Sequence, residues 1–80
     1  MNLDEYQAAA LETAMCPRNL VYPALGICGE VGEFIQSAIT HCPLVRKSKE
    51  LGDILWYVAM TASDMNLKLS KVMERKTATF

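Results

Sequence analysis

Hydrophobic residues recur every three or four positions along most of the chain, the spacing that places them on one face of an α-helix. A first helix is predicted over residues 3–15, with Asn2 available as its N-cap. A second helix is predicted to begin between Asn19 and Pro23, because proline is tolerated in a first turn, and to end near His41. No segment shows the convincing two-residue alternation of a β-strand.

The second half of the chain continues this helical pattern. A third helix is predicted to begin within residues 46–48 and to end at Asp64, after which Asn66 suits a left-handed position. A short fourth helix follows, with Ser70 as its expected N-cap and with Val72 and Met73 facing inward. Because the connections are short, neighbouring helices are expected to be antiparallel. The prediction is an all-α fold, a single domain over residues 1–80 that forms a small antiparallel bundle of about four helices.

The composition predicts that this bundle does not act alone. A chain of 80 residues buries only about 60–65% of its unfolded surface, so its own core is marginal. Yet 51% of the residues are hydrophobic. This surplus predicts that a second copy of the chain covers apolar surface and completes the core, as in a homodimer or a homotetramer.

The net charge, the hydropathy and the cysteines argue against a nucleic-acid-binding, membrane or secreted protein. The net charge of −1 gives no electrostatic basis for binding nucleic acid, and no apolar run approaches the roughly 20 residues of a membrane span. Cys16, Cys28 and Cys42 are odd in number and widely spaced, and Met1 is not followed by a secretory leader. We therefore expect a cytoplasmic protein with reduced thiols.

Two pairs of acids lie in the apolar centre of the sequence, one in "GEVGE" and one in "KELGD". A helix turns about 100° per residue, so Glu30 and Glu33 share one narrow stripe with Gly26 and Ser37. This stripe borders the apolar face of the second predicted helix. Either acid pair alone is typical of a solvated helix face, and that alternative stays open for each pair taken singly.

The second pair is arranged like the first. Glu50 and Asp53 lie three residues apart on the third predicted helix, with Tyr57 on the same stripe. All four glycines of the chain flank the two acid pairs, although a glycine inside a helix costs about 1 kcal/mol relative to alanine. We interpret the glycines as sites where the two backbones approach closely and bring the four carboxylates together.

Four neighbouring carboxylates repel one another, and a divalent cation relieves that repulsion. Ligands that are all carboxylate oxygens favour a hard ion, Mg²⁺ first and Mn²⁺ second. Mg²⁺ held in this way keeps coordination positions for phosphate oxygens and lowers the pKa of a bound water. The acid pairs therefore predict hydrolysis of a phosphoanhydride bond.

Basic and aromatic residues near the second acid pair are candidates for binding the substrate. The candidate cations immediately before Glu50 are Arg46, Lys47 and Lys49, and those late in the chain are Lys68, Lys71, Arg75 and Lys76. Each of these charges is also consistent with an ordinary solvated surface. Trp56 and Tyr57 follow the pair directly, and Trp56 is placed either to stack on a nucleobase or to serve as a core or interface aromatic.

The same residues resemble the MazG-like family of all-α nucleoside triphosphate pyrophosphohydrolases. The similarity rests on "GEVGEFIQ" followed by "KELGDILWYVA", and weaker similarity extends to "NLDEYQAAALETA" and "LSKVMERK". The resemblance implies hydrolysis of (d)NTP to (d)NMP and pyrophosphate, by attack of a metal-activated water on the α-phosphorus. It implies Mg²⁺ bound by Glu30, Glu33, Glu50 and Asp53, one of which, or an outer acid, orients the water. It also implies a dimer, or a tetramer built from dimers.

The last helix departs from the family pattern. Relatives commonly carry an asparagine and then a lysine there, and this chain has Lys76 and Thr79 at those positions. Lys76 is a candidate to replace the lysine from one turn earlier. The departure supports an alternative, a catalytically weak or inactive nucleotide-binding module. A third possibility is a structural helical oligomer whose acids are merely exposed.

Overall fold

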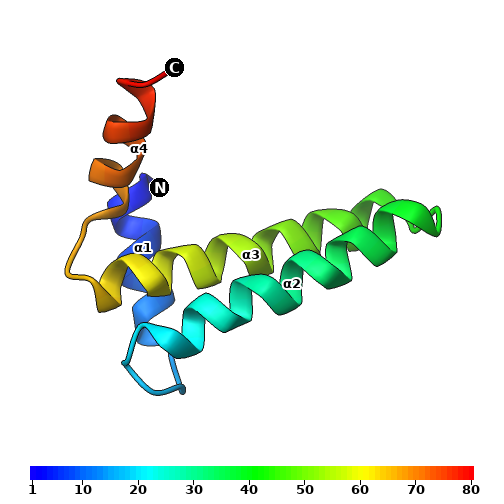
Figure 1. Cartoon of the computed structure of the whole chain (residues 1–80), viewed down its shortest axis with the longest axis horizontal. Helices are drawn as coiled ribbons and strands as arrows, with labels where there is room; N and C mark the ends of the chain where they lie inside the picture. Colours follow the sequence, from blue (N-terminus) through cyan, green and yellow to red (C-terminus); the bar gives the residue numbers. More distant parts are fainter.

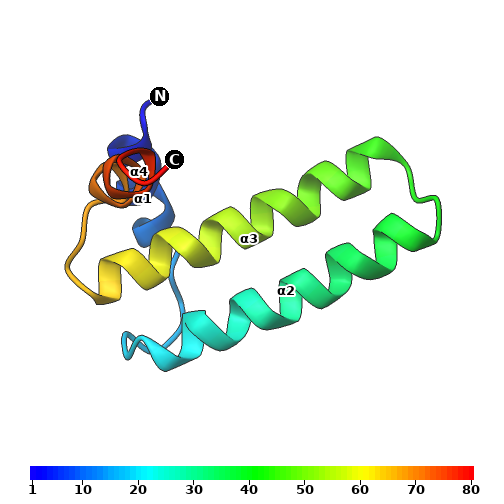
Figure 2. The same ribbon diagram turned by 45° about the horizontal axis from the view of Figure 1, so that its top comes forward.

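The computed structural model describes all 80 residues and contains four α-helices and no strand. The helices are α1 (Leu3–Glu12), α2 (Val21–Ile39), α3 (Leu44–Asp64) and α4 (Leu69–Thr77). Figure 1 shows α2 and α3 running side by side in opposite directions as a long hairpin. In Figure 2, α1 and α4 lie together at one end of that hairpin, so the other end projects freely. The predicted all-α fold is confirmed.

The start of α1 follows the sequence prediction. The backbone N–H of Glu5 donates to Asn2 Oδ1 at 2.8 Å, and the backbone N–H of Asn2 donates to Glu5 Oε1 at 3.1 Å. This reciprocal capping box satisfies N–H groups that a helix start otherwise leaves unpaired. The helix ends at Glu12, three residues earlier than expected, because Thr13 caps it and donates its hydroxyl to the carbonyl of Ala10 at 2.7 Å.

The connection between α1 and α2 is tied to the end of α3 by one carboxylate. Asp64 accepts a hydrogen bond from Arg18 Nε at 2.5 Å and another from the backbone N–H of Leu20 at 2.9 Å. Leu20 has a φ of 63°, which is strained for a leucine. The two hydrogen bonds to Asp64 hold this strained turn and bring the start of α2 beside the end of α3.

The hydrophobic core lies at the end of the hairpin where α1, α3 and α4 meet. Its buried residues are Ala10, Ala59, Ala62 and Leu69. Gln7 of α1 lies beside this core, where its Nε2 donates to Ser63 Oγ at 3.1 Å and to the carbonyl of Leu67 at 2.8 Å. Its Oε1 accepts from the backbone N–H of Leu69 at 2.8 Å, so one side chain fastens the start of α4.

The sequence prediction for α4 is wrong in three respects. Lys68 is the N-cap, and Ser70 lies in the first turn, where its N–H and hydroxyl both donate to the carboxylate of Asp4 in α1. Val72 and Met73 are 37% and 51% exposed, so they do not face a core within one copy of the chain. Finally, α4 stands across α3 instead of lying antiparallel to it (Figure 1). It packs on α1 and α3.

The hairpin itself leaves apolar side chains uncovered. Val31 and Ile35 on α2 and Leu51 and Leu55 on α3 are each at least 40% exposed. On each helix these residues lie one and five positions after the first acid, so they are on the same side of the acid stripe. Because α2 and α3 are antiparallel and their stripes face each other, the four side chains share one side of the hairpin. We call this side the outer apolar face. No helix is long and apolar enough to cross a membrane.

Candidate functional site between α2 and α3

The acid stripes of the two hairpin helices face each other, as their spacing predicts. Ser37 and Glu50 are the buried polar residues of the chain, at 3% and 7% exposure. They come from the predicted stripes of α2 and α3, respectively. On the same stripes, Gly26 packs against the ring of Tyr57. The hairpin therefore presents Glu30, Glu33, Glu50 and Asp53 toward the space between the helices or its rim.

One acid of each pair contributes to a pocket near the middle of the hairpin. Glu30 from α2 and Asp53 from α3 line this pocket, whose volume is about 340 Å³. Trp56 and Tyr57 form the rest of its lining. Both predicted aromatic residues are thus next to two of the predicted acids, and we call this the aromatic pocket.

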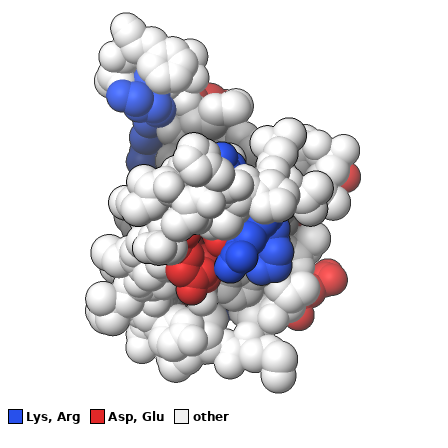
Figure 3. All heavy atoms as spheres, turned by 90° about the vertical axis from the view of Figure 1, so that its right-hand side faces the viewer, with Lys and Arg blue, Asp and Glu red and all other residues white.

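The other two acids, Glu33 and Glu50, line a second pocket of about 410 Å³ toward the turn between α2 and α3. We call it the turn pocket. Apart from these acids it contains cations, hydroxyls, an amide and a thiol: Gln36, Ser37, Thr40, Cys42, Arg46 and Lys49. Figure 3 views the molecule from this end and shows acidic and basic side chains next to each other near the middle of the face. The turn pocket therefore places two carboxylates beside two cations, and Lys and Arg side chains can form charge-assisted hydrogen bonds with carboxylate or phosphate groups.

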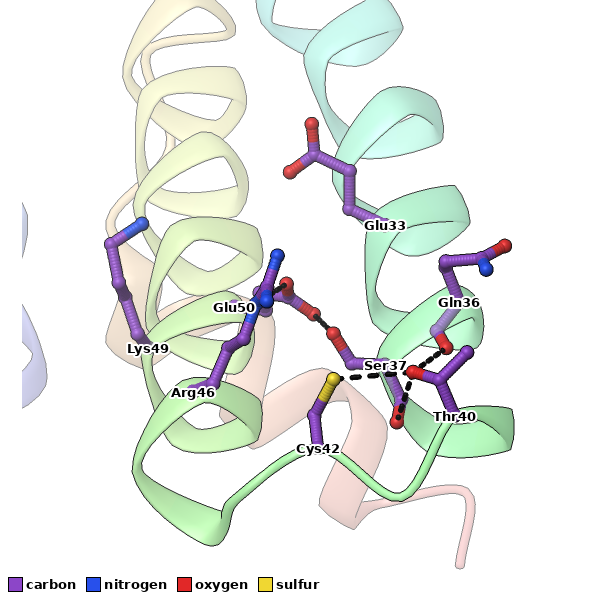
Figure 4. Close-up of a pocket in the computed structure, with 8 residues that line it drawn as sticks. All are labelled: Glu33, Gln36, Ser37, Thr40, Cys42, Arg46, Lys49 and Glu50. Carbon is purple, nitrogen blue, oxygen red and sulfur yellow. Dashed lines mark hydrogen bonds and ion pairs between the residues drawn. The ribbon is translucent and has the colours of Figure 1, made fainter.

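Glu50 is held in the turn pocket by a side chain from the opposite helix. Ser37 Oγ donates a hydrogen bond of 2.5 Å to Glu50 Oε2, and Figure 4 shows the two side chains pointing at each other across the hairpin. Arg46 Nε lies 3.7 Å from the other oxygen, Oε1, and the Arg46 side chain is 66% exposed. The hydroxyl is thus the hydrogen-bond donor that fixes this carboxylate.

Glu30 differs from Glu50 because one of its carboxylate oxygens is buried without a hydrogen-bond donor. Its Oε2 is buried and has no hydrogen-bond partner. Burial raises the pKa of Glu30, and the neighbouring carboxylates Glu33 and Asp53 raise it further. The nearby cation Lys49, which pairs with Asp53 at 3.4 Å, acts in the opposite direction but does not reverse the shift. A buried, unpaired carboxylate oxygen beside two other acids is a place where a cation would remove an electrostatic cost.

The four acids nevertheless do not surround a single point. No three of the chain's histidine, cysteine, aspartate and glutamate residues lie close enough together to hold a metal ion between them. The acids instead line two separate pockets as pairs across the hairpin. Glu30 and Asp53 line one pocket, and Glu33 and Glu50 line the other. The expectation of four carboxylates gathered together is thus met only pairwise within one copy.

The proposed reason for the glycines is wrong at three of the four positions. A Cβ atom on Gly26 would overlap the ring of Tyr57, so this glycine does permit close approach of α2 and α3. A Cβ atom on Gly29, Gly32 or Gly52 would meet nothing within 4 Å. The structure gives no packing reason for those three glycines within one copy of the chain.

The two side chains of the aromatic pocket are held by contact with each other and with the end of α1. Trp56 Nε1 donates to Thr13 Oγ1 at 2.9 Å, which anchors the indole to the end of α1. Its ring meets that of Tyr57 edge to face, with centroids 5.0 Å apart. Burial raises the pKa of Tyr57 above its ordinary value, which already leaves the phenol protonated at neutral pH. No pattern in the sequence predicted that Thr13 would hold the indole.

Lys76 is not brought to either pocket. It lies on α4, and its Nζ is 5.8 Å from the centre of the Phe80 ring. Two of the basic residues predicted near the substrate, Arg46 and Lys49, line the turn pocket. The others do not: Lys47, Lys68, Lys71, Arg75 and Lys76.

Comparison with known proteins decides the family. Residues 23–78 match the MazG nucleotide pyrophosphohydrolase domain. The chain belongs to the MazG family. The matched segment contains α3, α4 and all but the first two residues of α2, and therefore both acid pairs of this MazG domain. The Gene 37 protein of Mycobacterium phage L5 is 33% identical over 93 residues, an alignment that covers 94% of this chain and 82% of the phage protein. No solved structure matches the chain.

Proposed function

We propose that this MazG domain is a Mg²⁺-dependent nucleoside triphosphate pyrophosphohydrolase that converts (d)NTP to (d)NMP and pyrophosphate. Membership of the family supports a nucleotide pyrophosphohydrolase in general. The observation that carries the finer proposal is the buried oxygen of Glu30, which lacks a partner and lies near Glu33 and Asp53. An acidic helix face that was merely solvated would not leave such an oxygen buried.

The donor atoms of the four acids suit a hard divalent cation, although the acids lie as two separate pairs within one copy of the chain. Glu30, Glu33, Glu50 and Asp53 offer only carboxylate oxygens, the ligand type that favours Mg²⁺ and then Mn²⁺. We propose these four acids as the metal ligands. When bound, Mg²⁺ would offset the charge of the polyphosphate and lower the pKa of a water molecule.

The side chains of the domain have separate tasks in this reaction. One of the four acids, or an acid outside the metal shell, accepts the proton of the water that attacks the α-phosphorus. Lys49 and Arg46 attract the β- and γ-phosphates into the turn pocket, which they line beside Glu33 and Glu50. Lys49 is better placed for this task than Lys76, because Lys76 lines neither pocket.

The aromatic pocket is the place proposed for the nucleoside. Trp56 and Tyr57 line it together with Glu30 and Asp53, so a base held against these rings would keep the α-phosphate near the acids. Stacking on an aromatic ring is worth about 1–3 kcal/mol per base. The hydrogen bond from Trp56 to Thr13 orients the indole in advance, which lowers the entropic cost of binding.

We also propose that the domain assembles as a homodimer or homotetramer. The outer apolar face leaves Val31, Ile35, Leu51 and Leu55 exposed by 40%, 54%, 53% and 41%. A second copy that covered this face would supply the apolar burial that a short chain lacks. Sedimentation analysis of the purified protein tests the assembly, and a monomer at micromolar concentration would contradict it.

The enzymatic proposal is tested by pyrophosphate release from a panel of (d)NTPs with Mg²⁺. Glu50→Gln serves as the control, because glutamine keeps the shape of the side chain and its capacity to accept from Ser37 but removes the charge. Release by the wild type and loss in the variant are expected. No release by the wild type, or equal release by both, would contradict the proposal.

The alternative is a module that binds a nucleotide without hydrolysing it. The position of Lys76, away from both pockets and over the ring of Phe80, favours this alternative, because the last helix then supplies no cation to the phosphates. Thermal stabilisation by (d)NTP and Mg²⁺ without pyrophosphate release would support the module over the enzyme.

A further inference from the structure

Ser37 and Glu50 form a buried polar contact far from the hydrophobic core. The core lies where α1, α3 and α4 meet, whereas Ser37 lies near the end of α2 and Glu50 near the start of α3, close to the turn that joins them. At 3% and 7% exposure they are as well shielded from water as the core alanines. Burying a carboxylate is costly unless it is hydrogen-bonded. The hydroxyl of Ser37 therefore has a role that simple packing at this end of the hairpin would not require.

The geometry leaves one oxygen of Glu50 available. Ser37 Oγ donates to Oε2 at 2.5 Å, and no hydrogen bond reaches Oε1. Arg46 Nε, at 3.7 Å from Oε1 and on a largely exposed side chain, is too distant for a hydrogen bond and contributes little. Figure 4 shows the contact spanning the hairpin beside Glu33, in the turn pocket. Glu50 is thus fixed through one oxygen, and its other oxygen accepts no hydrogen bond from the chain.

The other three acids lack such a contact. Glu30 has a buried oxygen without a partner, and the pairing of Asp53 is with Lys49 of its own helix. Among the four acids, Glu50 alone is hydrogen-bonded to the opposite helix. Removal of a group that orients a metal ligand in this way typically lowers metal affinity or activity 10–100-fold.

We propose that Ser37 is a positioning residue, which holds the carboxylate of Glu50 in the orientation needed to bind the divalent cation. This inference rests on the proposed function, because it assumes that Glu50 is a metal ligand. Ser37 itself touches neither the cation nor the nucleotide. It fixes the side chain of Glu50 before the cation arrives and so spares the ordering cost of a flexible glutamate.

Mn²⁺ binding to the purified, nucleotide-free protein tests the inference directly. The free Mn²⁺ concentration is followed by electron paramagnetic resonance for the wild type, Ser37→Ala and Ser37→Thr. We expect Ser37→Ala to weaken Mn²⁺ binding about tenfold or more, and Ser37→Thr, which keeps the hydroxyl, to stay within about threefold of the wild type. Wild-type affinity in Ser37→Ala, or equal weakening in both variants, would overturn the inference.

A matched control separates positioning from folding. Thr77→Ala removes a hydroxyl on α4 that lines neither pocket and bonds to the carbonyl of Met73, not to an acid. This variant is expected to bind Mn²⁺ like the wild type. All variants are compared well below their melting temperatures, which are measured without metal. A purely structural role of Ser37 would lower the melting temperature and leave the Mn²⁺ dissociation constant of the folded protein unchanged, and that result would overturn the inference.

The same experiment distinguishes failure of the inference from failure of the proposed function. If the wild type binds Mn²⁺ and releases pyrophosphate from (d)NTP, but Ser37→Ala does both equally well, only the role of Ser37 is refuted. If the wild type neither binds Mn²⁺ nor releases pyrophosphate, the proposed function is refuted and the role of Ser37 falls with it.

Discussion

The ring of Tyr57 on α3 packs directly against the backbone of Gly26 on α2. A Cβ atom at position 26 would overlap three atoms of that ring. Because Tyr57 also lines the aromatic pocket beside Glu30 and Asp53, the absence of a side chain at Gly26 sets how closely the two helices approach there.

Gly26→Ala is therefore expected to destabilise the fold. Alanine favours a helix by about 1 kcal/mol over glycine, but forcing a methyl group into a filled space costs about 1–3 kcal/mol. Because Tyr57 is fixed between α2 and Trp56, whose indole is itself hydrogen-bonded to Thr13, we expect the steric cost to be larger. Urea unfolding monitored by circular dichroism measures the free energy of unfolding.

Gly29→Ala is the matched control for this experiment. It lies one helical turn away on α2, and its added Cβ atom would meet nothing within 4 Å. The same gain in helix propensity should then stabilise the protein by up to about 1 kcal/mol. A stabilising Gly26→Ala, or equal effects of the two substitutions, would show that Tyr57 does not constrain the hairpin.

Asp64 makes the stability depend on acid pH. The hydrogen bond from Arg18, and then the one from the backbone of Leu20, lower the pKa of Asp64. A lowered pKa means that the folded state favours the charged carboxylate. Its stabilising effect is present above the pKa of the unfolded chain and is lost as pH falls through the lowered value. Asp64→Asn should therefore melt below the wild type from pH 5 to 8, and the difference should shrink below about pH 4.

The control for Asp64 is an exposed ion pair. Glu74 pairs with Lys71 at 3.2 Å, and both side chains are 59% exposed. Glu74→Gln should change the melting temperature little at any pH, because such pairs contribute at most about 1 kcal/mol. Equal pH profiles of Asp64→Asn and Glu74→Gln would contradict the assigned role of Asp64.

Local signals predicted most of the fold. The cap at Asn2 and the end of α3 at Asp64 depend on residues close in sequence, and both are confirmed. Asn66 has a φ of 56°, as its place after a helix end predicted. The prediction of Ser70 as the N-cap of α4 is wrong because its N–H and hydroxyl both donate to Asp4, which is 66 residues away in the sequence. No local pattern shows that contact.

The site was predictable in the same partial way. Helical spacing alone placed Ser37 and Tyr57 on the stripes that carry the acids. The division of the acids into two pockets depends on how far α3 is shifted along α2, and a single sequence does not contain that offset. The same offset decides that the ring of Tyr57 meets Gly26 and that the hydroxyl of Ser37 meets Glu50.

Gln7 provides a prediction about the attachment of α4. Its amide makes three hydrogen bonds, to Ser63 Oγ, the carbonyl of Leu67 and the N–H of Leu69. Gln7→Ala leaves part-buried backbone groups without these partners, at about 1–3 kcal/mol. Hydrogen exchange at the amide of Leu69 should become about tenfold faster or more. Gln36→Ala, an exposed position on α2, should leave that exchange rate unchanged, and unchanged exchange in Gln7→Ala would contradict the prediction.

The raised pKa of Glu30 predicts opposite effects of one substitution with and without a divalent cation. Burial, and then Glu33 and Asp53, raise this pKa, so the folded chain disfavours the charged form when no cation is bound. Glu30→Gln removes that charge and should raise the melting temperature in a chelator at pH 7–8. The gain should disappear as pH falls toward about 4, where the carboxyl is protonated in the folded and the unfolded states.

Adding Mg²⁺ should reverse the order of the two proteins. A cation that binds only the folded wild type stabilises it in proportion to the logarithm of the Mg²⁺ concentration above its dissociation constant. Glu30→Gln should gain much less, because it has lost one of the four proposed ligands. Melting curves at several Mg²⁺ concentrations measure both slopes, with Glu12→Gln as an exposed control on α1. If Glu30→Gln melted below the wild type in the chelator, or gained as much from Mg²⁺, Glu30 would not be the strained carboxylate that a cation relieves.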